Sequence, residues 1–174
     1  MNFGKSIQLF FAAILVSLAL PVTVHSAEKV KVSATFSILG DMVKRVGGQH
    51  VAVTTLVGPD GDTHVYRPTP AAAKAISEAN LLIVNGLGFE GWLDRLVEAS
   101  DFKGERVVAT KGIDAIPFGD SEGHDEHAKD KHDEHAHHDH GEFDPHAWQS
   151  LANAAIYVNN VTAALAQVSP DNAV

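Results

Sequence analysis

Histidine is the residue type with which this sequence could do metal chemistry. Eight of its 11 histidines lie between positions 119 and 148, and the sequence contains no cysteine and 2 methionines. Neutral imidazole is a good ligand for Zn²⁺, Cu²⁺ and Ni²⁺, whereas Mg²⁺, Ca²⁺ and Mn²⁺ favour oxygen ligands. Any metal site must therefore be built from histidine and carboxylate side chains, and Zn²⁺ is the first choice of ion.

Residues 119–142 form a tract that is rich in histidine and acidic residues. It has nine carboxylates, two lysines, no apolar periodicity and a near-repeat, HDEHA, that starts at positions 124 and 132. Such a low-complexity segment is typical of a flexible loop that collects metal ions, although a solvated charged linker is the alternative. We predict low-affinity metal binding by its seven histidines, which are His124, His127, His132, His135, His137, His138 and His140.

Two further histidines have settings that indicate a structured site. His64 lies in the segment GPDGDTHVYRPTP, a loop between a predicted strand and a predicted helix. His146 lies in EFDPHAW, where Asp144 and Pro145 predict the start of a helix with His146 at its second position. A lone histidine in a loop is usually a surface residue, but these two flank one histidine-rich tract. We therefore predict that His64 and His146 bind the same ion.

The apolar pattern predicts an α/β fold. Four strands are expected at residues 30–35, 51–57, 81–84 and 106–110. Helices are expected after a Ser37 cap, over residues 70–79 behind a Thr69 cap, around residues 92–97, and over residues 145–168 with Leu151, Val158 and Leu165 on the apolar face. Alternating strands and helices with short connections predict a parallel sheet with helices on both faces. Ligands of such sheets bind beyond the carboxyl ends of the strands, where both histidine loops would lie.

Composition and charge narrow the class of protein. A hydrophobic fraction of 45% supports a globular core, and a formal net charge of −9 argues against a nucleic-acid partner. Residues 1–26 have the basic, apolar and small-residue regions of a secretory signal peptide, with cleavage expected between Ser26 and Ala27. Because the sequence has no cysteine that could be acylated, we expect an exported protein without a lipid anchor.

The motifs around the two histidines resemble those of a known family. The segments GPDGDTHVYRPTP and FDPHAW, with an acidic histidine-rich loop between them, look like the zinc-binding solute receptors of bacterial ABC transporters, the cluster A-I substrate-binding proteins. In that family the histidines at the positions of His64 and His146 are metal ligands. Many relatives have proline where this sequence has Thr63, a change that leaves the histidine in place.

The resemblance implies a fold, a partner and a location. The fold would be one of two α/β lobes that are joined by a long linking helix, with the ion in the cleft and a third histidine and a carboxylate supplied by the second lobe. We expect a lobe at residues 27–118, the loop at 119–142, and the second ligand motif with the start of the linking helix at 143–174; the second lobe is expected to be absent from this sequence. The implied function is a monomeric periplasmic receptor that delivers Zn²⁺ to an ABC membrane permease.

Three alternatives stay open at this point. The first is a manganese or iron receptor of the same family, and the second is a zinc storage or chaperone protein that acts through the histidine-rich tract. The third is a metallohydrolase, for which Glu90 and Glu142 are the candidate general bases in loops. Neither glutamate lies in an HExxH-like motif. We therefore expect that the protein is not an enzyme.

Overall fold

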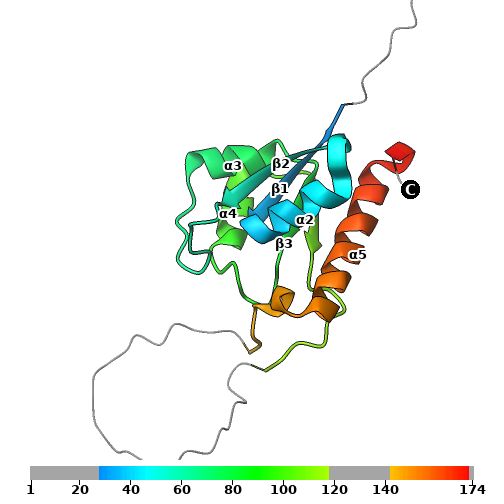
Figure 1. The fold of residues 1–174 in the computed structure, drawn as a ribbon. Helices are drawn as coiled ribbons and strands as arrows, with labels where there is room; N and C mark the ends of the chain where they lie inside the picture. Colours follow the sequence, from blue (N-terminus) through cyan, green and yellow to red (C-terminus); the bar gives the residue numbers. More distant parts are fainter. Residues whose placement is uncertain (1–27, 118–141, 173–174) are drawn as a thin grey trace, which may run out of the picture.

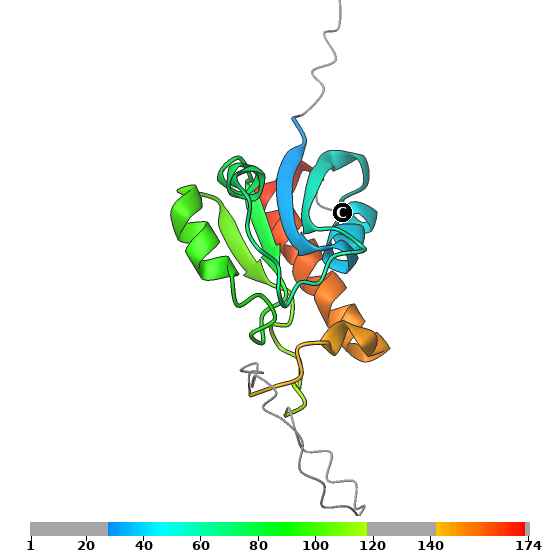
Figure 2. The ribbon, with the colours of Figure 1, turned by 90° about the vertical axis from the view of Figure 1, so that its left-hand side faces the viewer.

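The computed structural model describes residues 28–117 and 142–172. The predicted signal peptide, residues 1–26, and the seven histidines of the tract lie outside the described residues. The described part is a four-stranded parallel sheet with helices on both of its faces (Figures 1 and 2). The predicted fold class is confirmed.

The sheet has the strand order β2-β1-β3-β4, and all neighbouring strands are parallel. The strands are β1 (Val30–Phe36), β2 (Val51–Val57), β3 (Leu81–Val84) and β4 (Glu105–Val108). The bounds predicted for β2 and β3 agree with the structure, and β4 begins and ends earlier than predicted. Because the chain leaves β1 and β3 toward opposite faces of the sheet, the topological switch point of the sheet lies at the carboxyl ends of these two central strands.

The helices form one layer on each face of the sheet. They are α2 (Ser37–Gly47), α3 (Pro70–Ser77), α4 (Leu93–Ser100) and α5 (Leu151–Val168), with short 3₁₀ turns η1 (Gly48–His50), η2 (Ala147–Gln149) and η3 (Pro170–Asn172). Helices α2 and α5 pack on one face, and α3 and α4 pack on the other (Figure 2). As predicted, Thr69 caps α3: its hydroxyl accepts a hydrogen bond from the Ala72 amide at 3.2 Å.

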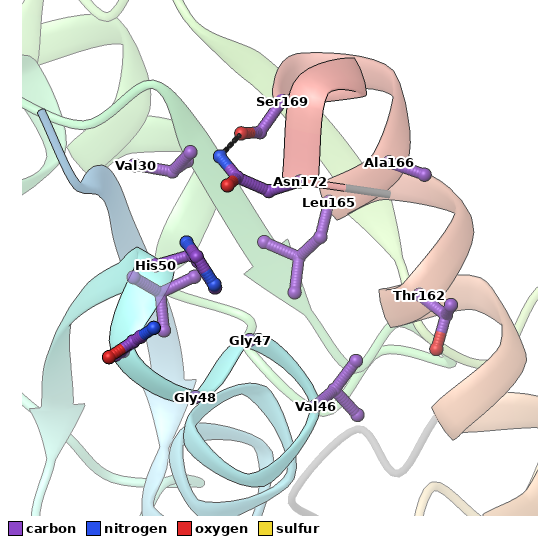
Figure 3. A pocket seen from close by; sticks show the side chains of 12 residues that line it. Val30, Val46, Gly47, Gly48, His50, Thr162, Leu165, Ala166, Ser169 and Asn172 are labelled. Carbon is purple, nitrogen blue, oxygen red and sulfur yellow. Dashed lines mark hydrogen bonds between the residues drawn. The ribbon is translucent and has the colours of Figure 1, made fainter. Parts of the chain in front are cut away.

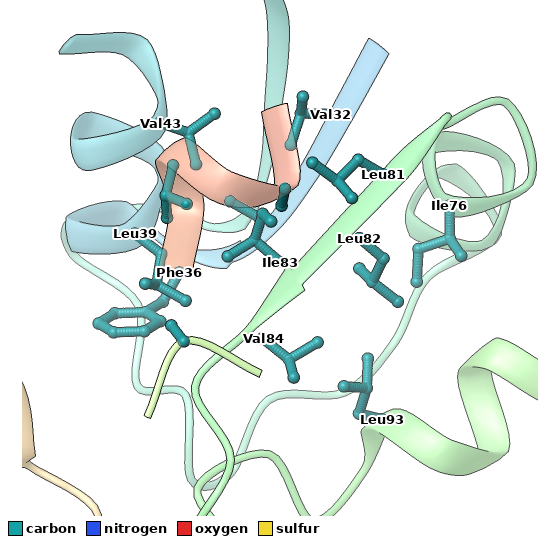
Figure 4. Close-up of a cluster of buried hydrophobic side chains, with 14 of the residues drawn as sticks. Val32, Phe36, Leu39, Val43, Ile76, Leu81, Leu82, Ile83, Val84 and Leu93 are labelled. Atoms are coloured by element: carbon teal, nitrogen blue, oxygen red, sulfur yellow. The ribbon is translucent and has the colours of Figure 1, made fainter. Parts of the chain in front are cut away.

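The core is centred on β3, whose four residues are all fully buried. Side chains that alternate along β3 point to the two helical layers (Figure 4). Leu81 and Ile83 face the layer that contains Leu39 and Val43 of α2, whereas Leu82 faces Ile76 of α3 (Figure 4). A strand that is buried on both faces reads as a continuous apolar run, which is why the sequence predicts it well.

The helix that follows His146 differs from the prediction in its start and in its buried face. It begins at Leu151, where the Ser150 side chain accepts from the Asn153 amide, so His146 precedes both α5 and η2 and is not a helical residue. The buried residues of α5 are Tyr157, Val161, Ala164 and Leu165, whereas Leu151 is 91% exposed and Val158 is 37% exposed. The predicted face omitted Tyr157, whose ring is buried because its hydroxyl finds a partner inside the core.

Helix α5 also belongs to this lobe, since it packs against α2, β3 and β4.

Within the described residues, no helix is both long enough and apolar enough to cross a membrane.

Candidate metal centre

His64 and His146 meet at the carboxyl edge of the sheet although 82 positions separate them. Their Nε2 atoms are 3.2 Å apart, and the centroids of the two rings are 5.3 Å apart. His64 lies on the connection from β2 to α3, and His146 lies on the connection from β4 to α5. The two connections bring together the two histidines that the sequence predicted as partners.

The separation of the two nitrogens suits a shared metal ion. Two imidazole nitrogens bound to one tetrahedral Zn²⁺ at 2.0–2.1 Å are about 3.3 Å apart. The observed 3.2 Å therefore needs almost no rearrangement. Two adjacent ligands of an octahedral ion have a comparable spacing, and so do two rings joined by a hydrogen bond. The distance is therefore compatible with a shared ion but does not select which ion.

Asp144 sets the orientation of the His146 ring. Its Oδ1 atom accepts from the His146 amide at 2.9 Å and lies 2.7 Å from His146 Nδ1. Hydrogen bonds from the amide and then from the ring hold the pKa of Asp144 below its usual range, so the side chain is an anionic acceptor at neutral pH. The proton of a neutral ring therefore resides on Nδ1, and the lone pair of Nε2 faces His64. This carboxylate–histidine arrangement is the one found behind metal ligands in proteins.

Asp62 fixes the His64 loop in a similar way. Its Oδ1 accepts from the His64 amide at 2.9 Å, so each histidine follows an aspartate by two positions and bonds to it. The loop is also tied to the lobe by Trp92, whose Nε1–H donates to the carbonyl of Thr63 at 2.8 Å. Thr63 itself is buried. Sequence reasoning missed both aspartates, although the shared Asp-x-His spacing could have indicated them.

Aromatic rings form the floor of the site. The Phe89 ring lies 4.8 Å from the His64 ring and 5.8 Å from the His146 ring, measured between centroids. The Trp148 ring lies 5.4 Å from His146 and 4.7 Å from Phe36, which ends β1. This packing restricts the rotation of both imidazole rings while His64 remains exposed and open to an incoming ion.

The turn that delivers Phe89 has an unusual backbone. Three consecutive residues after Asn85, namely Gly86, Leu87 and Gly88, have φ between 54° and 89°. Glycine adopts this region freely, whereas Leu87 does so at a cost of about 1 kcal/mol. The turn therefore needs stabilising contacts from neighbouring residues. Glu90 provides two of them, because its side chain accepts hydrogen bonds from the Asn85 amide at 2.7 Å and from the Gly86 amide at 3.2 Å.

Neither candidate general base has the setting of one. Glu90 is buried and also accepts from the Thr35 hydroxyl at 2.6 Å, so both of its oxygens are engaged in supporting the turn. Desolvation raises the pKa of Glu90, and the hydrogen bonds oppose that rise. Glu142 is exposed at the border of the described residues. The arrangement supports ion binding and offers Glu90 no access to a substrate.

The two histidines are an incomplete ligand set. Within residues 28–117 and 142–172, no group of three or more histidine, cysteine, aspartate or glutamate side chains is arranged to hold a metal ion. A cavity of about 200 Å³ lies beside His146 and Asp144 and is also lined by Asp114 and Asn153. A larger cavity of about 400 Å³ lies at the opposite edge of the sheet, between α5 and the turn at Gly47 and Gly48 (Figure 3). Among the described residues that line this cavity, His50 is the one histidine and there is no carboxylate.

Comparison with known proteins identifies relatives over most of the chain. The manganese-binding lipoprotein MntA of Halalkalibacterium halodurans is 36% identical over 152 residues, which cover 87% of this chain and 44% of MntA. The manganese ABC transporter substrate-binding lipoprotein scaA of Streptococcus gordonii is 32% identical over 156 residues, which cover 86% of this chain and 45% of scaA. The chain therefore spans about half the length of the relatives that it matches.

Solved structures show the same architecture. The Mn-bound periplasmic metal binding protein from Candidatus Liberibacter asiaticus has a TM-score of 0.68 and 33% identity, with 84% of this chain and 48% of that chain covered. Zn(II)-bound AdcA from Streptococcus pneumoniae has a TM-score of 0.64 and 26% identity, with 82% of this chain and 27% of AdcA covered.

The family match is broader than the motifs alone. The family described as periplasmic zinc-uptake complex component A, or ZnuA, matches residues 32–174. This range contains every described strand and helix apart from the first two residues of β1. The resemblance that the two histidine motifs indicated is confirmed, and the chain belongs to the ZnuA family of periplasmic zinc-uptake components.

Proposed function

We propose that this chain is the metal-binding lobe of an extracytoplasmic receptor that captures a divalent ion and delivers it to an ABC membrane permease. The observation that carries the proposal is the 3.2 Å separation of the His64 and His146 Nε2 atoms, with Asp144 behind the second ring. The named relatives support the transporter role, because scaA is named as an ABC transporter substrate-binding protein. In this role the ion is cargo, and the protein is a monomeric receptor and not an enzyme.

We propose Zn²⁺ as the preferred ion. Two imidazole ligands at one site favour Zn²⁺ over Mn²⁺ in affinity, and the histidine-rich tract adds further ligands of the same type. The competing candidate is Mn²⁺, which is favoured by the names of MntA and scaA and by the Mn-bound solved structure. A competition titration compares the two ions, and Zn²⁺ is expected to displace Mn²⁺ from the chain at equimolar metal, as the general affinity order of divalent ions also predicts. Displacement of Zn²⁺ by Mn²⁺ would transfer the proposal to manganese.

The decisive test is calorimetric titration of the chain with Zn²⁺ and comparison with two single variants. His64→Ala and His146→Ala are each expected to abolish the tightest site, because one remaining imidazole cannot hold the ion. His50→Ala is the matched control, since His50 is an exposed histidine at the opposite edge of the sheet. The proposal fails if both variants keep the stoichiometry and affinity of the parent chain.

The histidine-rich tract separates this proposal from zinc storage. Deletion of residues 123–140 removes all seven tract histidines. A receptor is then expected to retain one tight site that depends on His64, whereas a storage protein loses all binding.

We also propose a periplasmic location, reached through the signal peptide at residues 1–26. The relatives MntA and scaA are named lipoproteins, whereas this sequence has no cysteine. We therefore predict a protein without a lipid anchor. Cell fractionation tests this prediction, because an unanchored protein is expected in the periplasmic fraction and a lipoprotein in the membrane fraction.

A further inference from the structure

Asn85 is a fully buried polar residue that has been given no role in the metal centre described above. It follows the last residue of β3 and is 0% exposed. Its backbone amide donates to Glu90, and its backbone carbonyl accepts from the Thr110 hydroxyl at 2.7 Å. Both backbone polar groups of Asn85 therefore have hydrogen-bond partners that do not involve its side chain.

The side chain of Asn85 connects three parts of the chain. Its Nδ2 donates to the carbonyl of Pro145 at 2.9 Å and to the carbonyl of Gly86 at 3.1 Å. Its Oδ1 accepts from the Tyr157 hydroxyl of α5 at 2.7 Å. Pro145 immediately precedes His146, so this amide attaches the second metal loop both to the end of β3 and to α5.

The hydrogen-bond partners of the Asn85 side chain allow only one orientation of its amide group. The carbonyls of Pro145 and Gly86 can only accept hydrogen bonds, so the NH₂ group must face them. The oxygen then faces Tyr157, whose hydroxyl must donate. All polar atoms of the side chain are satisfied, and exchanging the oxygen and the nitrogen would leave the carbonyls of Pro145 and Gly86 facing an acceptor.

We propose that Asn85 is a positioning residue of the metal centre, which holds the Asp144–His146 loop so that the His146 ring is at ligand distance from His64, with Tyr157 fixing the orientation of the Asn85 amide. The role rests on the proposed function, because it specifies how the second ligand is held before an ion arrives. Residues of the loop itself orient the ring, whereas Asn85 fixes the loop on the lobe.

Asn85→Asp is the principal test, made in the full 174-residue chain. The aspartate has nearly the same shape but presents an acceptor to the Pro145 and Gly86 carbonyls, so the loop attachment is lost. Zn²⁺ affinity is expected to fall about 10- to 100-fold, the range found when a supporting partner of a metal ligand is removed. Tyr157→Phe is the milder second variant, which keeps the Pro145 bond but removes the donor that orients the amide. It is expected to lower the affinity less, by about 3- to 10-fold, and it serves as the test if Asn85→Asp does not fold.

Ser33→Ala is the matched control. Ser33 is also buried in the central sheet, and its hydroxyl makes one hydrogen bond, to the carbonyl of Ala75 at 3.0 Å. Loss of that bond is expected to lower stability without changing Zn²⁺ affinity, because Ala75 has no connection to the His146 loop.

A metal-free readout separates this inference from the proposed function. In ¹H–¹⁵N spectra of the histidine rings, the His146 signals are expected to shift or broaden in Asn85→Asp and Tyr157→Phe, and to stay unchanged in Ser33→Ala. The positioning role is overturned if folded variants keep both the parental ring signals and the parental Zn²⁺ affinity. His64→Ala and His146→Ala variants that both bound Zn²⁺ normally would refute the metal centre, and the ring signals would still decide whether Asn85 holds the loop.

Discussion

Two aspartates perform related but unequal tasks beside the histidines. Asp62 bonds to the backbone amide of His64, whereas Asp144 bonds to the amide and also to the ring of His146. The difference matters because a bond to the backbone shapes a loop, while a bond to the ring also fixes the tautomer and raises the basicity of the ligand nitrogen.

This difference predicts unequal effects of two matched substitutions. Asp144→Asn keeps an oxygen that can accept from the amide but removes the charge behind the ring, so Zn²⁺ affinity at pH 7.5 is expected to fall about 10-fold or more. Asp62→Asn serves as the control and is expected to weaken binding by less than about threefold, since an asparagine oxygen can still accept from the His64 amide. Calorimetric titration of both variants measures the difference. Equal losses in the two variants would contradict the role assigned to the ring contact.

The turn after β3 is the element on which the site depends most. It runs through the positive φ of Leu87, presents Phe89 beneath the histidines and is held by the buried carboxyl of Glu90. Because burial raises the pKa of Glu90, the folded state binds a proton at this group more tightly than the unfolded state does. Its contribution to stability is therefore present below the unfolded pKa, near 4.5, and is lost as the pH rises through the folded pKa.

Glu90→Gln tests this pH dependence. The difference in unfolding free energy, parent minus variant, is expected to decline as the pH rises above about 4.5, because the variant has no group to ionise at this position. A constant destabilisation of about 1–3 kcal/mol is expected in addition, since the new amide must point one donor at a backbone N–H. Urea unfolding at several pH values between 4 and 8 measures both effects. A difference that does not vary with pH would contradict this prediction, because it would show that the pKa of Glu90 is the same in the folded and unfolded states.

The elements differ in how well local sequence specifies them. The segments of β2 and β3 are apolar runs between clear turn residues, and Thr69 with Pro70 is a strong start signal, so these bounds could be predicted. The start of α5 could not, because Asp144 with Pro145 and Ser150 are both plausible caps, and the chain uses the first for the His146 turn. The convergence of His64 and His146 was predictable because ligands of a parallel sheet bind beyond the carboxyl ends of its strands, where both histidine loops were expected. The bonds from Asn85 to Pro145 and Tyr157 span 60 and 72 positions and leave no local pattern.

At the scale of the whole lobe, the residues that flank the histidine-rich tract on its two sides are paired with each other. Pro117 and Phe143 form an antiparallel bridge, and the Asp144 amide donates to the carbonyl of Ile116 at 2.8 Å. These contacts join the two described segments of the chain directly beside the metal loop. We therefore expect the described lobe to reach its fold without the intervening length of chain.

Replacement of residues 119–141 by a short glycine–serine linker tests this independence. The melting temperature is expected to change by no more than about 4 °C, because shortening a loop alters its closure entropy by less than about 1 kcal/mol. Tight Zn²⁺ binding through His64 and His146 is expected to persist, while additional weak sites disappear. Differential scanning calorimetry and titration measure the two properties, and a large drop in melting temperature would indicate that the segment is part of the folded lobe.

The two tryptophans of the sequence each contact a different metal loop. Trp92 donates to Thr63 beside His64, and Trp148 packs against the ring of His146. Each half of the ion site thus contains its own fluorophore, and the rest of the chain contributes no indole emission. Variants that retain a single tryptophan would report separately, in real time and without an added dye, when each loop responds to an arriving ion.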